Sequence, residues 1–498
     1  MLAEGFRVDH ALTEGDTIEW GPARITVIAT PGHTDGALTY LVEVDGRRVA
    51  FTGDLIYAPG QVYELYSMQK GNEFVCDYHG FLGTREQTVA SLRKVQAAGV
   101  ETLVPAHGVV MPDPAAAIDA LEAQLKTCYD DYAAISALRW YFPQMFPTYL
   151  DGPHVMPIRK GQAPPSFLRN VSTTWAIISE SGAAFIMDCW NADVIAEIQR
   201  WRDAGEITSV EGLWITHYHY DHTEGIPEFK RVFGGPVIAD PAVAQIAANP
   251  LAWRLTCNTA NTIPVDHWTA HGERWQWREF TMTAYHFPGQ TLYHDALLVE
   301  GRGLRMLFVG DSFTPAGIDD YCAHNRNFLG AGVGFDRCLA LVEELKPDML
   351  FNPHVDVAFD FTPEEIACMR ANLAKREKSF GALFPWDHPN YGMDDCWVYC
   401  TPYEQHLAPG AIFHLDVMVT NHSTVPHNAA VRAALPRAWG GGHSHETTAI
   451  IPPKTVARLP IHVTLPYDAK PGRFAIPVDL RYDELTLPQI NEAVVEIR

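Results

Sequence analysis

The sequence predicts an α/β protein that ends in an all-β region. Two observations lead to this prediction. A unit of two strands, a helix, a third strand and a second helix occurs twice, because two long stretches of the chain align without a gap. After about residue 385 the helical spacing of apolar residues stops, and an alternation of apolar and polar residues typical of strands takes over.

The repeat is visible in PGHTDGALTYLVEVDGRRVAFTGD, which begins at Pro31, and in PGQTLYHDALLVEGRGLRMLFVGD, which begins at Pro288. Asp54 and Asp311 end the two stretches, and every equivalent pair is separated by the same number of positions. Amphipathic helices are predicted after them, over 84–99 in the first copy. The other predicted helices are 335–347 and two that begin with proline, 113–125 and 362–374.

The first copy of the repeat is incomplete. The motif THYHYDH at 216–222 precedes the second copy, and its counterpart for the first copy would fall ahead of residue 1. Residues 1–138 are therefore expected to form the back half of a domain. Its apolar sheet face would need cover from the rest of the chain or from another subunit of a homo-oligomer. A misplaced or truncated gene start is the alternative.

The remaining boundaries follow from proline content and periodicity. Residues 139–165 are predicted to be a linker, because six prolines between 141 and 167 disfavour helix interiors and central strands. Residues 166–385 would form the complete domain, and 386–498 a C-terminal β-sandwich of the immunoglobulin-like type. The stretches with strand-like alternation in this last region are 411–423, 455–466 and 472–483.

Composition restricts the partners of the protein. The 498 residues carry a formal net charge of −23, which disfavours nucleic acid, and no run of Lys or Arg offers a local basic patch. No apolar run is long enough to cross a membrane, and the first ten residues lack the features of a signal peptide. From this sequence we therefore expect a cytoplasmic protein. The nine cysteines are scattered, with only Cys396 and Cys400 close together, which predicts free thiols.

The stretch GLWITHYHYDHTEGIP places four candidate metal ligands within six residues, at the end of an apolar strand. His217 and His219 are two residues apart, so on an extended backbone their side chains point to the same side. Asp221 and His222 follow where the chain begins to turn, and they can face a neighbouring ion. Imidazole and carboxylate ligands suit zinc, with iron or manganese as alternatives.

Two further candidate ligands stand at the ends of later apolar strands, Asp311 in LFVGD and His354 in FNPH. Together with the His-x-His-x-Asp-His motif, they make the chain resemble the metallo-β-lactamase superfamily. The resemblance covers roughly residues 165–380, and its back half recurs over 1–135. It implies a four-layer αβ/βα sandwich with a site for two divalent metal ions at the edge of its two sheets. Zinc is the expected metal.

The resemblance also implies a role for each ligand. The first ion would take His217 and His219, the second would take Asp221, His222 and His354, and Asp311 would bridge the two. Such ions lower the pKa of bound water toward about 7 and would supply a metal-bridged hydroxide as the nucleophile. Asp221 could orient it or accept its proton. Tyr218, Tyr220 and Tyr293 are near enough in sequence to reach a developing oxyanion, with a packing role as the alternative.

One position departs from the family pattern. The third histidine for the first ion normally stands in Pro-Gly-His, which the first copy keeps as His33, whereas the complete copy has Gln290. His294, four residues later, is the expected substitute, provided that the segment before it is a loop or bulge rather than a regular strand. Gln290 as a ligand, or a position left to water, are the alternatives.

The leading hypothesis is a metal-dependent hydrolase that acts on a small-molecule carbonyl substrate, which would be an ester, a lactone, a thioester or an amide. An iron-dependent oxidoreductase on the same fold and a non-catalytic binding protein are the alternatives. The reductive diiron members of the family usually carry Glu where this chain has His219. His443 and His445, in GGGHSHETT, form another His-x-His pair but are expected to be loop residues.

Overall fold

The computed structural model describes residues 7–63, 81–146, 149, 154–253, 255, 257–320, 330–384, 394 and 396–498. The chain forms two compact units. The first consists of Met1–Met156, Tyr321–Ala323 and Cys368–Asp387, and the second of Pro157–Asp320, His324–Ala367 and His388–Arg498. Helix α9 (Pro363–Leu383) therefore contributes residues to both units. The domain limits expected at 138, 165 and 385 stay a prediction.

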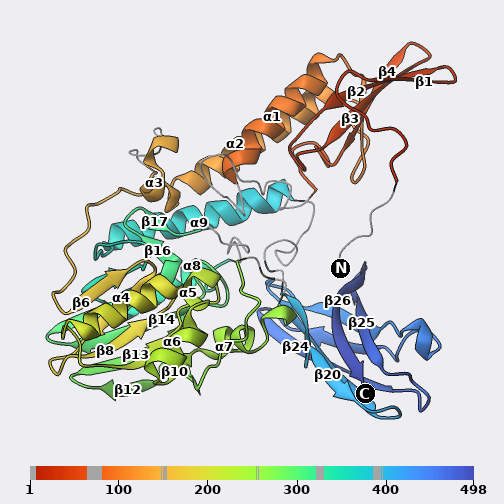
Figure 1. Cartoon of the computed structure of the whole chain (residues 1–498). Helices are drawn as coiled ribbons and strands as arrows, with labels where there is room; N and C mark the ends of the chain where they lie inside the picture. Colours follow the sequence, from red (N-terminus) through yellow and green to blue (C-terminus); the bar gives the residue numbers. More distant parts are fainter. Residues whose placement is uncertain are drawn as a thin grey trace. The chain divides into compact units, whose positions relative to one another are not determined.

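A five-stranded sheet forms the core of the first unit (Figure 1). Its strands follow chain order: β1 (Thr17–Trp20), β2 (Ala23–Ala29), β3 (Leu38–Val44), β4 (Arg47–Gly53) and β5 (Thr102–Pro105). The first four are antiparallel, and β5 runs parallel to β4. Helix α1 (Phe81–Ala97) connects β4 to β5, and α2 (Pro114–Ala133) follows. Asp113 caps α2 by accepting a hydrogen bond from the Ala116 amide, with Pro114 in the first turn.

The second unit repeats this sheet. Its strands are β12 (Arg274–Trp277), β13 (Phe280–His286), β14 (Asp295–Gly301), β15 (Leu304–Phe308) and β18 (Met349–Phe351). Their order and directions are those of β1 to β5, with only the last pair parallel. The internal repeat that the sequence predicted is therefore confirmed.

A second sheet, of six strands, faces the repeated one. Its order is β11 (His267–Trp268), β10 (Val237–Ala239), β9 (Ser209–Trp214), β8 (Ala183–Met187), β7 (Thr174–Ile178) and β6 (Leu168–Val171). The core between the two sheets is dominated by large side chains, among them Trp175, Trp214, Phe280 and Phe308.

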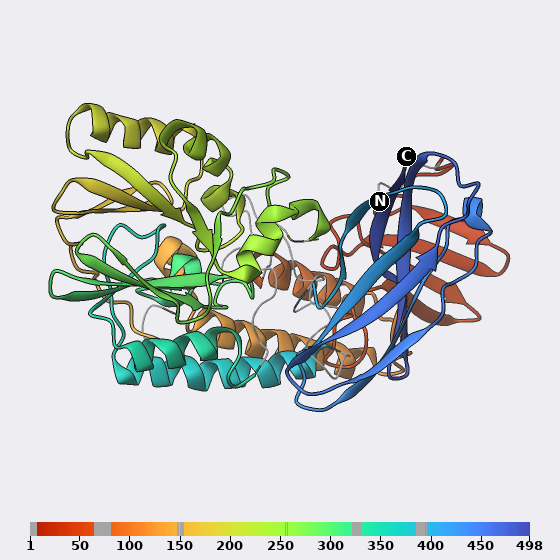
Figure 2. The same ribbon diagram turned by 90° about the horizontal axis from the view of Figure 1, so that it is seen from below.

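Helices cover the outer faces of both sheets. Three of them pack on the six-stranded sheet: α4 (Ala192–Asp203), α6 (Ile226–Phe233) and α7 (Pro241–Ala248). Helix α8 (Gly334–Leu345) lies outside the other sheet, as the layers in Figure 2 show. This arrangement confirms the predicted four-layer αβ/βα sandwich.

The N-terminal sheet has one face that no second sheet covers within the described part of its own unit. Residues that line an apolar hollow of about 800 Å³ there include Trp20, Ile25, Tyr40, Val42 and Phe51. In the repeat their equivalents lie in the core between the two sheets: Trp277, Met282, Leu297, Val299 and Phe308. Trp20 is 75% exposed and Phe51 44%, against 9% for Trp277 and 2% for Phe308. The homo-oligomer contact expected at this face stays a prediction.

The C-terminal region is all β, as predicted. One sheet has the order β19 (Val398–Thr401), β21 (Ile412–Asn421) and β24 (Thr455–Thr464). The other has the order β20 (Glu404–Leu407), β26 (Leu485–Ile497), β25 (Gly472–Tyr482), β22 (His427–Ala433) and β23 (Thr447–Ile451). Their inward side chains form one apolar core, because buried and exposed positions alternate along β21 and β24. No helix among the described residues is long and apolar enough to cross a membrane.

Candidate metal centre

The His-x-His-x-Asp-His motif begins where the chain leaves β9 at the edge of its sheet. His217 and His219 are buried, and their ring centroids lie 4.4 Å apart, as expected for residues two apart on an extended chain. The short helix α5 (Tyr220–Thr223) follows at once and carries Asp221 and His222. The turn from strand to helix is what lets all four side chains of the motif face the same region.

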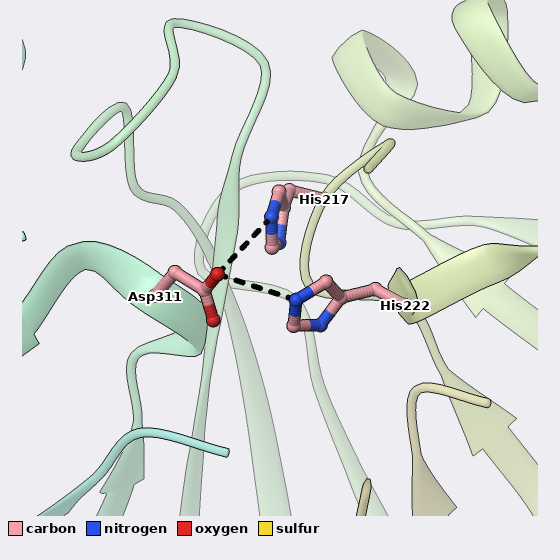
Figure 3. A group of neighbouring side chains, drawn as sticks. All are labelled: His217, His222 and Asp311. Carbon is pink, nitrogen blue, oxygen red and sulfur yellow. Dashed lines mark ion pairs between the residues drawn. The ribbon is translucent and has the colours of Figure 1, made fainter. Parts of the chain in front are cut away.

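Asp311 reaches this region from the opposite sheet. It lies in a turn, Gly310–Ser312, directly after β15. Its Oδ2 atom is 3.2 Å from His222 Nε2, 3.2 Å from His354 Nε2 and 3.7 Å from His217 Nε2. Figure 3 shows the Asp311 carboxylate opposite the rings of His217 and His222. One carboxylate oxygen thus lies within 3.7 Å of three imidazole nitrogens.

The open side of the group lies at Asp221 and His354. Asp221 Oδ2 is 3.3 Å from His354 Nε2 and 3.6 Å from His222 Nε2. The side chain of Asp221 is 21% exposed and that of His354 35%, whereas His222 is fully buried and Asp311 is 5% exposed. The group is therefore in contact with solvent on the side of Asp221 and His354.

The residues fit divalent metal ions. His217 Nε2, His219 Nε2 and Asp311 Oδ1 are buried and have no hydrogen-bond partner among the described residues, although buried polar atoms ordinarily have one. Two atoms that bind one tetrahedral zinc ion at ~2.1 Å each lie about 3.4 Å from one another. The distances from Asp311 Oδ2 to its three nitrogen neighbours span that value. Within this region, two sets of three residues have ligand atoms within 4.8 Å of each other, namely His217, His222 and Asp311, and Asp221, His222 and His354.

Burial and charge divide the histidines into two kinds. Burial lowers the pKa of His217 well below its ordinary value and the pKa of His219 to about 4, so both rings are neutral and able to bind a metal. Burial also acts to lower the pKa of His354, but the carboxylates of Asp311 and Asp221 outweigh it and raise that pKa to about 10. The pKa of His222 is raised for the same reason. A metal ion here would take the place of protons on His222 and His354.

Asp188 orients His222 and was not among the residues that the sequence indicated. It lies directly after β8 in the left-handed region, with φ of 64°. Its Oδ2 atom is 2.9 Å from His222 Nδ1, and its two oxygens accept hydrogen bonds from the amide and the hydroxyl of Thr216 at 2.8 and 2.7 Å. A carboxylate on Nδ1 leaves Nε2 free to bind a metal. The signal was present in the sequence, because Asp188 follows an apolar run, AAFIM, as Asp311 follows LFVG.

Gln290 and His294 both lie near the histidines but in different ways. The segment before β14 is a loop, and His294 pairs with His217 as an isolated bridge, their rings stacked with centroids 4.8 Å apart. A Cβ on Gly310 would lie 2.6 Å from the His294 ring, so the turn that carries Asp311 requires glycine there. Gln290 Nε2 donates to Asp311 Oδ2 at 3.4 Å, whereas His294 lies outside both three-residue sets. The identity of the third ligand stays a prediction.

The three tyrosines have different surroundings. Tyr218 is buried, with its ring centroid 4.8 Å from that of His219. Tyr220 is 38% exposed and packs edge-on against Trp190. Tyr293 donates its hydroxyl to Asp394 Oδ1 at 3.2 Å, and burial together with that carboxylate raises its pKa well above the ordinary value.

The N-terminal copy keeps three of the equivalent residues together. His107 Nδ1 is 2.8 Å from Asp54 Oδ1, and His33 Nε2 is 3.8 Å from Asp54 Oδ2. The side chain of His107 is 53% exposed, in contrast to the buried histidines of the motif. In the C-terminal region His443 pairs with Asp479 at 3.2 Å and lies outside the strands, as does His445. The seven described cysteines form no disulfide, and Cys76 and Cys322 lie outside the described residues.

An αβ/βα sandwich with histidines and aspartates gathered at the edge of its two sheets defines a class of metal-binding proteins. Residues 2–107 and 175–328, together more than half of the chain, match the family model of the metallo-beta-lactamase superfamily. The chain belongs to this superfamily. The match over 2–107 agrees with the internal repeat.

Individual relatives are more distant. A hydroxyacylglutathione hydrolase of Hahella chejuensis is 27% identical over 148 residues, which cover 30% of this chain and 49% of that protein. One of Mesorhizobium japonicum is 43% identical over 53 residues, 11% of this chain and 20% of the other. The chain thus spans about half the length, or less, of these curated relatives. Among solved structures, a mutant metallo-beta-lactamase of Cronobacter sakazakii aligns at 17% identity and a TM-score of 0.33, covering 44% of this chain and 96% of its own.

Proposed function

We propose that the second unit carries a metal-dependent hydrolase that uses two divalent metal ions to cleave a carbonyl substrate. Zinc is the metal that we assign to both positions. The observation behind this proposal is the approach of nitrogens from His217, His222 and His354 to one oxygen of Asp311, at 3.2 to 3.7 Å. The buried nitrogen of His219 without a hydrogen-bond partner among the described residues supports it. Membership of the superfamily supports it as well.

The residues of the site would have separate roles in metal binding and proton transfer. One ion would be held by His217 and His219, the other by Asp221, His222 and His354, with Asp311 between them and His294 as the proposed last ligand. When bound, such ions lower the pKa of a water molecule and polarise a carbonyl group. Asp221 is more exposed than Asp311 and lies on the open side, so we assign it the orientation of the attacking water and the acceptance of its proton.

Tyr218 and Tyr293 would act differently. Tyr218 packs beside His219 and is our candidate donor to the oxyanion that develops on the substrate. The hydroxyl of Tyr293 donates to Asp394, so we assign Tyr293 the holding of the loop that carries Gln290 and His294 rather than contact with the substrate. Asp394 itself is 3% exposed, and His422 Nε2 lies 2.6 Å from its second oxygen.

Among carbonyl substrates we propose thioesters first and esters, lactones and amides after them. The curated relatives are named hydroxyacylglutathione hydrolases, and hydroxyacylglutathione is a thioester. A net charge of −23 disfavours polyanionic substrates such as nucleic acids. The carboxylates and histidines at the open side of the group agree with a small polar substrate.

The test is a substrate panel with metal analysis. Purified protein should hydrolyse at least one generic thioester, ester or lactone, lose that activity with a chelator and regain it with zinc. Asp221→Asn should lower kcat by about 10²–10⁴, because the proton acceptor is removed. Iron bound in place of zinc, with no hydrolysis of any panel member, would instead favour the oxidoreductase. If the protein binds metal but shows neither hydrolysis nor oxidoreductase activity, the proposal that it is an enzyme is wrong.

A further inference from the structure

A second group of potential metal ligands lies apart from the histidine-rich site. Asp240 precedes α7, and its side chain caps that helix by accepting from the Ala242 amide. His286 ends β13 and Asp295 begins β14, and these two residues face each other as register partners of the antiparallel pair. Residues directly opposite on an antiparallel pair have neighbouring side chains on one face of the sheet. Three separate elements thus bring a histidine and two aspartates together.

The distances within this group suit a shared cation. His286 Nδ1 lies 3.6 Å from Asp240 Oδ1, and one ligand atom from each of the three residues lies within 4.8 Å of the others. Atoms that share a tetrahedral zinc ion are about 3.4 Å apart at ~2.1 Å from the metal. The Asp240 amide donates to Asp295 Oδ2 at 2.7 Å, which leaves Asp295 Oδ1 for another partner.

Two atoms of the group have no hydrogen-bond partner among the described residues. Asp295 is fully buried and its Oδ1 atom accepts no hydrogen bond. His286 Nδ1 is also buried and makes no hydrogen bond, although Asp240 Oδ1 lies 3.6 Å away. Asp240 is 7% exposed, and no described lysine or arginine forms an ion pair with either carboxylate. Two neighbouring carboxylates withdrawn from water are costly unless a cation or a proton lies between them.

The group is separate from the histidine-rich site, and two of its three residues border a cavity. Successive residues of an extended chain point to opposite sides, so Asp295 turns away from the side of its neighbour His294. Asp240 and His286 line a cavity of about 450 Å³ together with Tyr293 and Arg337. A cation could therefore enter from the cavity and retain a water molecule there.

We propose that Asp240, His286 and Asp295 form a third metal site, which binds one divalent transition-metal ion. Zinc is the metal that we assign to it. One imidazole nitrogen and two carboxylates are ligands that zinc accepts, and the cavity supplies the remaining position. The ion ties the start of α7 to the β13 and β14 pair. It thereby stabilises the beginning and end of the loop 287–294, which carries Gln290 and His294. This role is structural and does not depend on the proposed hydrolysis.

The test counts zinc in the full chain. Protein loaded with zinc, freed of excess metal and analysed by mass spectrometry should hold three ions per chain. Asp295→Asn and His286→Gln should each hold two, and zinc should raise their unfolding temperature less than it raises that of the unmodified chain. His286 is partly exposed, so its variant should fold even if the buried Asp295 variant does not. Glu404→Gln is the matched control, because Glu404, His406 and Glu496 form a similar but exposed group and the variant should still hold three.

The result separates this site from the histidine-rich one. Asp311→Ala should lose ions from the histidine-rich site while keeping the ion that His286→Gln removes. If the unmodified chain and His286→Gln bind the same number of ions, the proposal is wrong and the two aspartates share a proton instead. A single ion that is lost in His286→Gln and kept in Asp311→Ala would support the third site and contradict the binuclear hydrolase.

Discussion

His222 Nε2 and Asp311 Oδ2 lie 3.2 Å apart, although one side chain belongs to the helix after β9 and the other to the turn after β15 in the facing sheet. His354 Nε2 lies at the same distance from the same oxygen. Asp311 is thus the one described carboxylate that approaches His217, His222 and His354 together. Loss of this carboxylate should disturb every ligand at once.

The repeat offers a matched pair of aspartates, Asp311 and Asp54. We expect Asp311→Ala to abolish hydrolysis and remove metal, because two cations would lose the anion between them. Asp54→Ala should change hydrolysis little, since only His33 and His107 accompany Asp54 in the first copy. Metal content and kcat/KM measure both effects. Equal losses would show that the N-terminal copy takes part in catalysis, and a stoichiometric ion removed by Asp54→Ala would show that it binds metal.

The third ligand of the first ion can be assigned by two substitutions. Zinc prefers imidazole nitrogen to an amide oxygen, so we expect His294→Ala to lose one ion. Gln290→Ala should retain both ions of the histidine-rich site and alter activity only through its hydrogen bond to Asp311. Zinc content after dialysis measures the difference. The reverse outcome would make Gln290 the ligand, and two unaffected variants would leave the position to water.

Asp188 offers a test of how the metal ligands are held. We expect Asp188→Asn to lower zinc affinity about 10- to 100-fold, because His222 loses the carboxylate that fixes its tautomer and ring orientation. A competition assay with a chromogenic chelator measures the affinity. Asp193→Asn, an exposed change near the start of α4, is the control and should leave affinity unchanged. An unchanged affinity in Asp188→Asn would contradict the orienting role.

Metal binding should release protons. In chelator-treated protein the pKa of His354 is about 10, above the ordinary 6.5, because of Asp311 and Asp221. A raised folded-state pKa stabilises the fold fully below pH 6.5, and that contribution is lost as the pH rises through 10. Zinc competes with this proton, so affinity should rise with pH between 6.5 and 8. Calorimetry in buffers of different ionisation enthalpy should report at least one proton released per site, and no release would contradict the assignment.

The uncovered face of the N-terminal sheet leads to a stability prediction. Phe308→Ala should lower the free energy of unfolding by about 3–5 kcal/mol, because it empties part of the core between two sheets. Phe51→Ala, at the equivalent exposed position, should cost less than about 1 kcal/mol. Denaturant unfolding followed by tryptophan fluorescence measures both. A comparable loss in Phe51→Ala would show that this face is covered in solution, by the rest of the chain or by another subunit.

Elements with local patterns could be predicted from the sequence. The repeat, the helix that Asp113 begins and the alternating strands β21, β24 and β25 follow from spacing within short segments. His217 and His219 are likewise close because they are two apart on one strand end. The link from Asp188 to His222 and the bond from Tyr293 to Asp394 were not predicted, because each joins residues far apart in the chain and neither Asp188 nor Asp394 belongs to a recognised motif.

The sequence by itself determined the superfamily, the two copies of one sheet and the residue types able to bind metal, because strand periodicity and motif spacing are properties of contiguous residues. Only the tertiary structure decided the distances at which these residues meet. Asp311 and His354 approach the motif because two sheets pack face to face and bring the ends of β9, β15 and β18 to one edge. The same packing buries Trp277 in one copy and leaves its equivalent Trp20 exposed in the other, since burial depends on the facing layer and not on the residue.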